Sequence, residues 1–181
     1  GRLQENSVVN VKNHSFSVTA EIDVRKGKPA GGVIIAQGGR FGGWSLYAKD
    51  GKAKFVYNVL GIHEFATVAT EPMPEGKHQV RAEFAYDGGG LAKGGNVTLY
   101  YDGRPVGSGR VAMTQPMVFS MDETTDIGHD SGTPVSPDYS VHASKFTGKI
   151  EWVQIDLGPD AQDADHLITP EERLRVAMAR Q

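Results

Sequence analysis

The stretch from 121 to 139, MDETTDIGHDSGTPVSPDY, concentrates carboxylates among residues that favour turns. Its acidic members are Asp122, Glu123, Asp126, Asp130 and Asp138. Carboxylate and carbonyl oxygens in a flexible loop are the ligands that Ca²⁺ takes in proteins. The same residue types also cap backbone amides in Asx-turns, especially next to glycine and proline. The stretch therefore predicts either a calcium site or an ordered turn region.

An EF-hand is excluded by the spacing of this stretch. Counted from Asp126, the third position is Gly128 and the sixth is Ser131, where an EF-hand needs an oxygen ligand and a glycine. A calcium site of another kind would use Asp126 and Asp130, which flank a tight glycine-containing turn. We favour the turn interpretation, with calcium as the alternative and no other cofactor expected.

A second dense feature is the stretch 38–47, GGRFGGWSLY, which sets Arg40, Trp44 and Tyr47 beside four glycines. A sugar ring stacks on an aromatic face, while a guanidinium bonds its hydroxyl, sulfate or carboxylate groups. These three residues are the predicted ligand-binding set. In the structural alternative Trp44 points into the core, which leaves Arg40 and Tyr47 as the exposed members.

Motifs for catalysis are missing from the sequence. The six histidines are scattered without an H-x-H or H-x-x-x-H pair, and there is no cysteine. Neither G-x-S-x-G nor G-x-x-x-x-G-K-[ST] occurs. The glycine-rich loop 87–95 joins two predicted strands and opens no helix, so it predicts a connector. We expect no catalytic activity from this chain alone.

The elements that must position these residues are strands. In 15–24, SFSVTAEIDV, apolar residues alternate with polar ones, and 77–86, KHQVRAEFAY, repeats the pattern. The pairs Asp50-Gly51 and Asp102-Gly103 predict two-residue hairpin turns, because both positions need positive φ. In 149–157, KIEWVQIDL, the apolar residues change face, which indicates a bulge. Short strands with close turns predict an all-β antiparallel sandwich.

The C-terminal residues have a different pattern. Thr169, Pro170 and Glu172 form a capping box with proline at the first helical position, so a helix is predicted from about residue 170. We expect a sandwich over 1–158, with 159–181 as linker and helix. The helix would belong to the same domain or dock on a missing catalytic domain.

Bulk properties exclude several classes of partner. The net charge of -3 leaves no electrostatic footprint for nucleic acid. No apolar run approaches the ~20 residues that would span a bilayer. We therefore expect neither nucleic acid nor membrane as a partner.

Four segments in order resemble one family. They are AQGGRFGGWSLYAKDGKAKFVYN, EFAYDGGGLAKGGNVTLYYDG, DETTDIGHDSGTPVSPDY and ITPEERLRVAMARQ. Together they resemble the C-terminal domain of large bacterial arylsulfatases, which is similar to a concanavalin A or laminin G-like jelly roll. The resemblance implies that fold and a location in the periplasm or outside the cell.

The resemblance also implies a partner, the N-terminal sulfatase catalytic domain, which is missing from this chain. Sulfatases hydrolyse sulfate esters with a formylglycine made within a C/S-x-P-x-R motif, and this sequence contains no such motif. The expected function is therefore that of a non-catalytic accessory domain of a sulfatase. The alternative is a carbohydrate-binding module of laminin G type that recognises sulfated or other glycans. A free-standing hydrolase is the third interpretation, and it would need two carboxylates facing each other across a groove.

Overall fold

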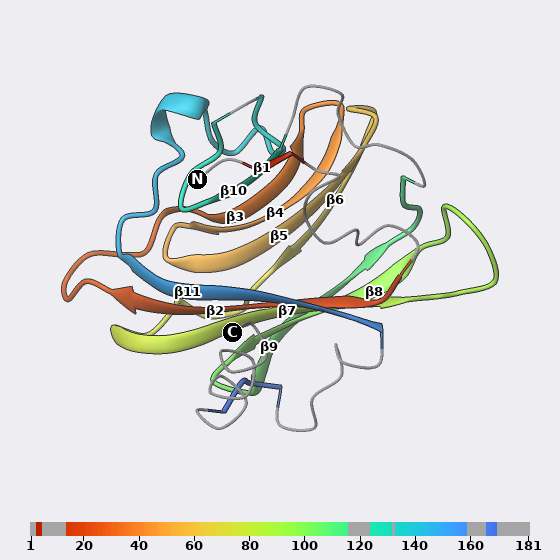
Figure 1. Cartoon of the computed structure of the whole chain (residues 1–181). Coiled ribbons are helices and arrows are strands. Elements are labelled where there is room, and N and C mark those ends of the chain that lie inside the picture. The colour runs from red at the N-terminus through yellow and green to blue at the C-terminus, as the bar shows by residue number, and fades with distance from the viewer. Residues whose placement is uncertain (1–2, 5–13, 116–123, 132, 159–165, 170–181) are drawn as a thin grey trace, which may run out of the picture.

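The chain folds into two antiparallel β-sheets that lie face to face (Figure 1). The computed structural model describes residues 3–4, 14–115, 124–131, 133–158 and 166–169. Sheet A has the strand order β1-β10-β3-β4-β5-β6, and sheet B has the order β11-β2-β7-β8-β9. The expected all-β sandwich is confirmed. The expected C-terminal helix lies outside the described residues.

The strands of sheet A are β1 (Leu3–Gln4), β3 (Gly32–Gly39), β4 (Gly42–Lys49), β5 (Lys52–Val59), β6 (His63–Val68) and β10 (Thr124–Ile127). Those of sheet B are β2 (Phe16–Val24), β7 (Gly76–Tyr86), β8 (Gly95–Tyr101), β9 (Arg104–Val111) and β11 (Lys149–Leu157). A short 3-10 helix, Val141–Ala143, precedes β11. No helix in the described ranges is long and apolar enough to cross a bilayer.

The core lies between the sheets, where the alternating apolar residues of both inner faces meet. Phe16 of β2 packs against Trp44 of β4 and Phe84 of β7, with ring centroids 5.5 and 5.4 Å apart. Trp44 also stacks on Phe55 of β5 at 6.0 Å. Aromatic rings in tilted or offset geometry add to the free energy of burial. This cluster holds the two sheets together.

The two Asp-Gly turns predicted from the sequence are confirmed. Asp50 and Gly51 have φ of 52° and 81°, and Asp102 and Gly103 have φ of 50° and 82°. The predicted bulge in β11 is also confirmed, because the register with β2 shifts between Ile150 and Trp152. One difference concerns the acidic stretch, in which residues 124–127 form a strand rather than a turn. Its residues Thr125, Asp126 and Ile127 pair with β3, since threonine and isoleucine suit a pleated surface.

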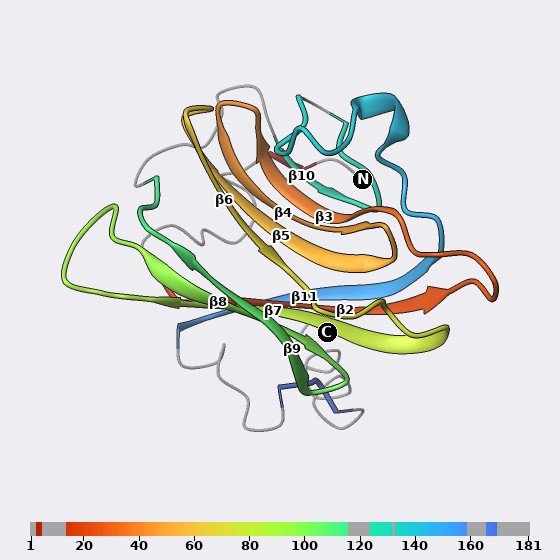
Figure 2. The same cartoon turned by 180° about the vertical axis from the view of Figure 1, so that it is seen from behind.

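Both outer faces of the sandwich carry additional chain. Residues 128–131 and 133–146 form a covering segment over the outer face of sheet A, and residues 166–169 lie below sheet B, as Figures 1 and 2 show from opposite sides. On sheet B the ring of His166 stacks on Tyr100 at 4.2 Å, and the Gln79 side chain bonds both the amide and the carbonyl of Ile168. On sheet A the covering segment builds the candidate site.

Candidate functional site: a cleft on the outer face of sheet A

A cleft of about 410 Å³ opens where two hairpin tips of sheet A meet the covering segment. One tip is the turn between β3 and β4, and the other is the turn between β5 and β6. The third wall is the proline-rich part of the covering segment. The lining residues are Arg40, Asn58, Gly61, Glu64, Thr133, Pro134, Val135, Ser136 and Pro137.

The side chain of Asn58 joins the three walls of the cleft. Its Nδ2 donates to the carbonyl oxygens of Arg40 and Val135, both at 3.0 Å, and its Oδ1 accepts from the Gly61 amide at 2.8 Å. The Arg40 amide in turn donates to Thr133 Oγ1 at 3.0 Å. Gly61 is needed because its φ is +71° and a Cβ there would lie 2.9 Å from the Arg40 oxygen. These hydrogen bonds hold the walls in place, and none of them involves the charged side-chain groups of Arg40 and Glu64.

Those charged groups are the Arg40 guanidinium and the Glu64 carboxylate. Arg40 is exposed, and neither charged group makes a hydrogen bond or ion pair within the described residues. Glu64 is also exposed, but partial desolvation by its neighbours raises the pKa of its carboxyl; nearby Lys54 opposes this shift and the charge of Asp138 adds to it. A guanidinium has only donors and a carboxylate only acceptors. The cleft thus presents both hydrogen-bond donors and hydrogen-bond acceptors to a ligand, on walls that are already held in place.

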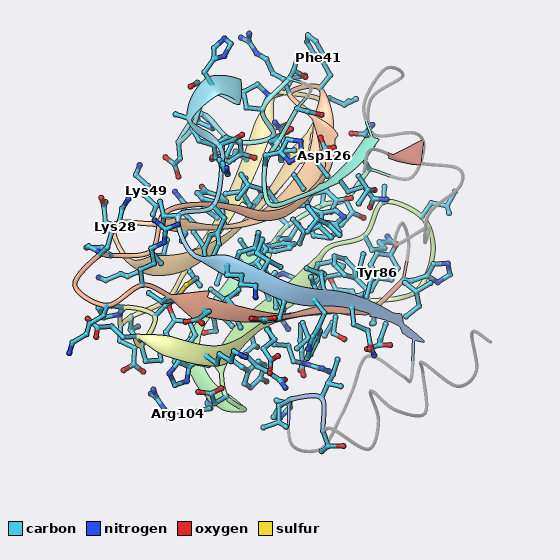
Figure 3. The ribbon with its side chains drawn as sticks, turned by 60° about the vertical axis from the view of Figure 1, so that its left-hand side comes forward. Lys28, Phe41, Lys49, Tyr86, Arg104 and Asp126 are labelled. Atoms are coloured by element: carbon cyan, nitrogen blue, oxygen red, sulfur yellow. The ribbon has the colours of Figure 1, made fainter. Side chains whose placement is uncertain are left out.

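An apolar tip stands beside the cleft. Phe41, Leu60 and Ile62 belong to the same two turns, and their side chains are 62%, 56% and 75% exposed. Figure 3 shows Phe41 at the top of the molecule, beyond the ends of the sheet A strands. Exposed large apolar residues that gather at one place mark interaction surfaces more often than isolated ones do. Phe41 can therefore serve as a stacking platform at the rim.

The predicted ligand-binding residues separate into three environments. Arg40 lies on the cleft, as a ligand-binding role requires. Trp44 is fully buried in the core, and its indole N–H donates to Gln37 Oε1 at 2.8 Å. It therefore takes the place that the structural alternative gave it. No surface ligand reaches Trp44 in this arrangement.

The expectation that Tyr47 is exposed is wrong, because the segment 133–139 covers it and leaves it only 1% exposed. Its hydroxyl bonds Ser136 Oγ at 2.9 Å and donates to the Asp138 carboxylate. The ring of Tyr139 meets it edge-on at 5.2 Å. Burial, followed by the bond to Asp138, raises the pKa of Tyr47. The residue holds the covering segment on the sheet instead of meeting a ligand.

The predicted metal ligands Asp126 and Asp130 take part in turns. Asp126 Oδ2 accepts from the amide and hydroxyl of Ser131, at 2.9 and 2.7 Å. Asp130 Oδ2 accepts from the Val135 amide at 3.1 Å and the Tyr139 hydroxyl at 2.8 Å. Such bonds are those that the turn interpretation requires.

The Asp126 Oδ1 atom is buried without a hydrogen-bond partner. Within the ranges described above, no group of three His, Cys, Asp or Glu side chains is placed to hold a metal ion. Asp122 and Glu123 lie outside those ranges. Calcium at Asp126 and Asp130 therefore stays a prediction.

Sequence reasoning missed Phe41 and Glu64. The signal for Phe41 is its place between two glycine pairs, which makes it the tip of a turn. The signal for Glu64 is its alternation with Phe65, which faces the core. Neither signal shows that the two residues flank the same cleft as the segment 133–137, because that segment is about 70 residues further along the chain.

Comparison with known proteins identifies the fold. No family model and no curated protein matches the sequence. The solved structure of the Ruminococcus gnavus IT-sialidase CBM40 bound to α2,3-sialyllactose matches with a TM-score of 0.56 and 13% identity. That match covers 87% of this chain and 82% of the other.

Two larger proteins contain a similar sandwich. Domains LG4–5 of the mouse laminin α1 chain match with a TM-score of 0.53, 14% identity and coverage of 87% and 38%. The binding domain of botulinum neurotoxin serotype C1 matches with 0.53, 15% identity and coverage of 98% and 39%. The chain therefore has a laminin G-like jelly-roll fold. None of these comparisons supports a sulfatase parent.

Proposed function

We propose that this chain is a carbohydrate-binding module that holds a glycan in the cleft between Arg40 and Glu64. The observation that carries the proposal is an unpaired guanidinium and an unpaired carboxylate on one preformed cleft, with Phe41 at the rim. Sugar hydroxyls both donate and accept, so they match this pair. The apolar face of a pyranose ring stacks on an aromatic side chain in the same way that other apolar groups do.

The cleft favours binding over hydrolysis. Glycosidases that use protein carboxylates need two of them flanking the scissile bond. Among the described residues that line the cleft, Glu64 is the single carboxylate. With one carboxylate among its described lining residues, the site suits recognition without turnover.

The charged group of Arg40 favours glycans that carry a carboxylate or a sulfate. A guanidinium forms paired, charge-assisted hydrogen bonds with such planar or tetrahedral anions. The fold is shared with a CBM40 domain whose structure was solved with sialyllactose. Sialylated and sulfated oligosaccharides are therefore the first ligands to test.

A glycan array followed by calorimetry on the best ligand tests the proposal. Arg40→Ala should weaken binding roughly tenfold or more, as expected for a lost charge-assisted pair. Phe41→Ala should weaken it by a smaller factor. Arg104→Ala is the matched control, because Arg104 is an exposed arginine in a hairpin of the other sheet. An array without hits, or equal affinity for Arg40→Ala and wild type, would refute the proposal.

The pH dependence reports which kind of sugar is bound. Because partial desolvation raises the pKa of Glu64, its carboxylate gains a proton earlier than usual as the pH falls. An anionic sugar should then bind more tightly, since repulsion from Glu64 disappears. A neutral sugar should bind more weakly, since an acceptor is lost. Glu64→Gln should remove the dependence in either case.

The sulfatase resemblance leads to a second, compatible proposal, in which this module is an accessory domain of a sulfatase. It rests on the four glycine-rich and C-terminal segments of the sequence alone. An antibody to the chain should then detect a native product several times larger than 19.5 kDa, with sulfatase activity that copurifies. A native product of the size of this chain would contradict it and leave glycan binding as it stands.

A further inference from the structure

A second groove, of about 500 Å³, runs along the edge of the sandwich where β10 and β11 face each other. Its floor is apolar, with Phe146, Ile150 and Val153. Its rim carries Lys145 and Lys149. The full lining is Ile127, Gly128, Lys145, Phe146, Gly148, Lys149, Ile150, Glu151, Trp152 and Val153.

Backbone pairing fixes the two rim lysines against a basic loop. Lys145 forms a bridge with Val33 at the start of β3, and Lys149 pairs with Asp23 near the end of β2. The loop between those strands reads RKGKPAG from 25 to 31. It is held in shape because the Gly27 amide donates to Glu75 at 2.9 Å and the Gly31 amide donates to Thr147 at 3.0 Å. The segment 145–149 therefore lies between the groove and the loop.

The cations on these segments outnumber the carboxylates. Arg25, Lys26, Lys28 and Lys145 are exposed, and none of them has an ion pair within the described residues. The remaining cations, Lys149 and Lys77, share one acid, Glu151, at 3.4 and 3.7 Å. The other nearby acids are Asp23, Glu75 and Glu21, which pairs with Trp152 of the groove. Six cations against four acids make this edge positive although the whole chain carries -3.

We propose that this edge groove binds an anionic polysaccharide, with its sulfate or carboxylate groups on Lys145, Lys149 and the loop 25–28. Sugar rings with regularly spaced anions match an apolar floor with a row of flexible ammonium groups. Half-exposed Trp152 adds an aromatic surface at the end of the groove. Nucleic acid is disfavoured because the net negative charge of the protein opposes a densely charged duplex.

The edge groove is separate from the Arg40 cleft. The two share no lining residue, and Figure 3 shows Phe41 well apart from Lys28 of the basic loop. The two proposals therefore stand on different residues, and each can fail alone. A long polysaccharide that engaged both would bind more tightly than either site by itself.

A titration with dextran sulfate, monitored by tryptophan fluorescence, tests binding to the edge groove. Trp152 supplies the signal, because the other tryptophan, Trp44, is buried in the core. Binding should weaken with added salt and should be absent with unmodified dextran. The double variant Lys145→Gln, Lys149→Gln should lose roughly tenfold in affinity, from two weakened charge contacts. Lys26→Gln with Lys28→Gln, on the loop, should act in the same direction.

Control variants test whether the loss of affinity is specific to the edge groove. The double variant Lys93→Gln, Arg110→Gln removes the same charge from the far end of the sandwich and should bind dextran sulfate like wild type. The double variant Lys145→Gln, Lys149→Gln should lose the same factor in affinity when it is made on an Arg40→Ala background, which separates this site from the cleft. The proposal would be overturned if the Lys93→Gln, Arg110→Gln variant lost as much affinity for dextran sulfate as the Lys145→Gln, Lys149→Gln variant. It would also be overturned if unmodified dextran, or a DNA duplex at the same salt, bound as tightly as dextran sulfate.

Discussion

Replacing Asp138 with asparagine removes the charge that fastens the covering segment to the outer face of sheet A. Its carboxylate accepts a hydrogen bond from the Tyr47 hydroxyl and pairs with Lys54 and, at 2.7 Å, with Lys49. Only 15% of the side chain is exposed. Burial by itself would raise the pKa of Asp138, but the bonds from Lys49, Lys54 and Tyr47 together hold it well below its usual value.

The expected loss of stability in Asp138→Asn follows from the hydrogen bonds that its carboxylate accepts. Hydrogen bonds to a charged group contribute about 1.5–3 kcal/mol, and those that water reaches contribute less. Lys49 is half exposed, so its share is small, whereas Tyr47 is buried and Lys54 nearly so. Asparagine keeps one acceptor but not the charge. We expect Asp138→Asn to lower the free energy of unfolding by about 2 kcal/mol. In a domain of this size that lowers Tm by roughly 4–8 °C.

The pH dependence has a definite sign. The folded pKa of Asp138 is lowered, so its contribution is fully present above the unfolded pKa of about 3.9 and is lost as the pH falls below it. Asparagine does not titrate. The difference in stability between wild type and Asp138→Asn should therefore be equal at pH 7 and pH 5, and should narrow below about pH 4.

Urea unfolding of both proteins across this pH range is the assay, and Glu71→Gln is the matched control. Glu71 pairs with Arg104 at the surface, where both side chains are 40% or more exposed. Its loss should cost less than about 0.5 kcal/mol. If Asp138→Asn costs no more than this control, or its effect persists unchanged at low pH, the charge of Asp138 does not hold the segment.

Further predictions concern the core, a hairpin and the calcium alternative. Trp44→Phe should cost about 2 kcal/mol in urea unfolding, because volume and the bond to Gln37 are lost; an unchanged midpoint would contradict the buried position. Gly43→Ala should cost roughly 1–3 kcal/mol, since its Cβ would lie 2.2 Å from the Gln37 carbonyl oxygen, and wild-type stability would show that the hairpin opens freely. A melt with EDTA and with Ca²⁺ should give the same midpoint, because Asp126 and Asp130 already accept bonds within the loop. A clear rise with Ca²⁺ would instead establish the metal site.

Local chemistry made much of the sandwich predictable. The alternation in 15–24 and 77–86 places the same residues inward that the paired register places inward, including Phe16 opposite Phe84. The Asp-Gly pairs give their turns because the two residues accept positive φ at low cost. The bulge in β11 follows from a change of face within nine residues. Each of these features depends on neighbours in the chain, so the sequence carries it directly.

The candidate cleft depends on contacts that no local pattern contains. Alternation indicates that Trp44 and Tyr47 point to opposite faces of β4. It does not indicate that a segment 90 residues later covers the face with Tyr47. The local sequence pattern is the same for an aromatic residue that a remote segment covers and for one that is exposed to solvent. That is why Tyr47 was predicted as a ligand contact and is found buried.

The sequence by itself determined the strands, the turns and the layer architecture, because period-two alternation and turn residues act over a few positions. Only the tertiary structure decided that Arg40, Glu64 and Pro134 share one cleft, and that Lys145 and Lys149 border a groove at the other end. The physical reason is that these groups approach through the pairing of distant strands and the path of one long connection. A sequence constrains such contacts only through the free energy of the whole fold.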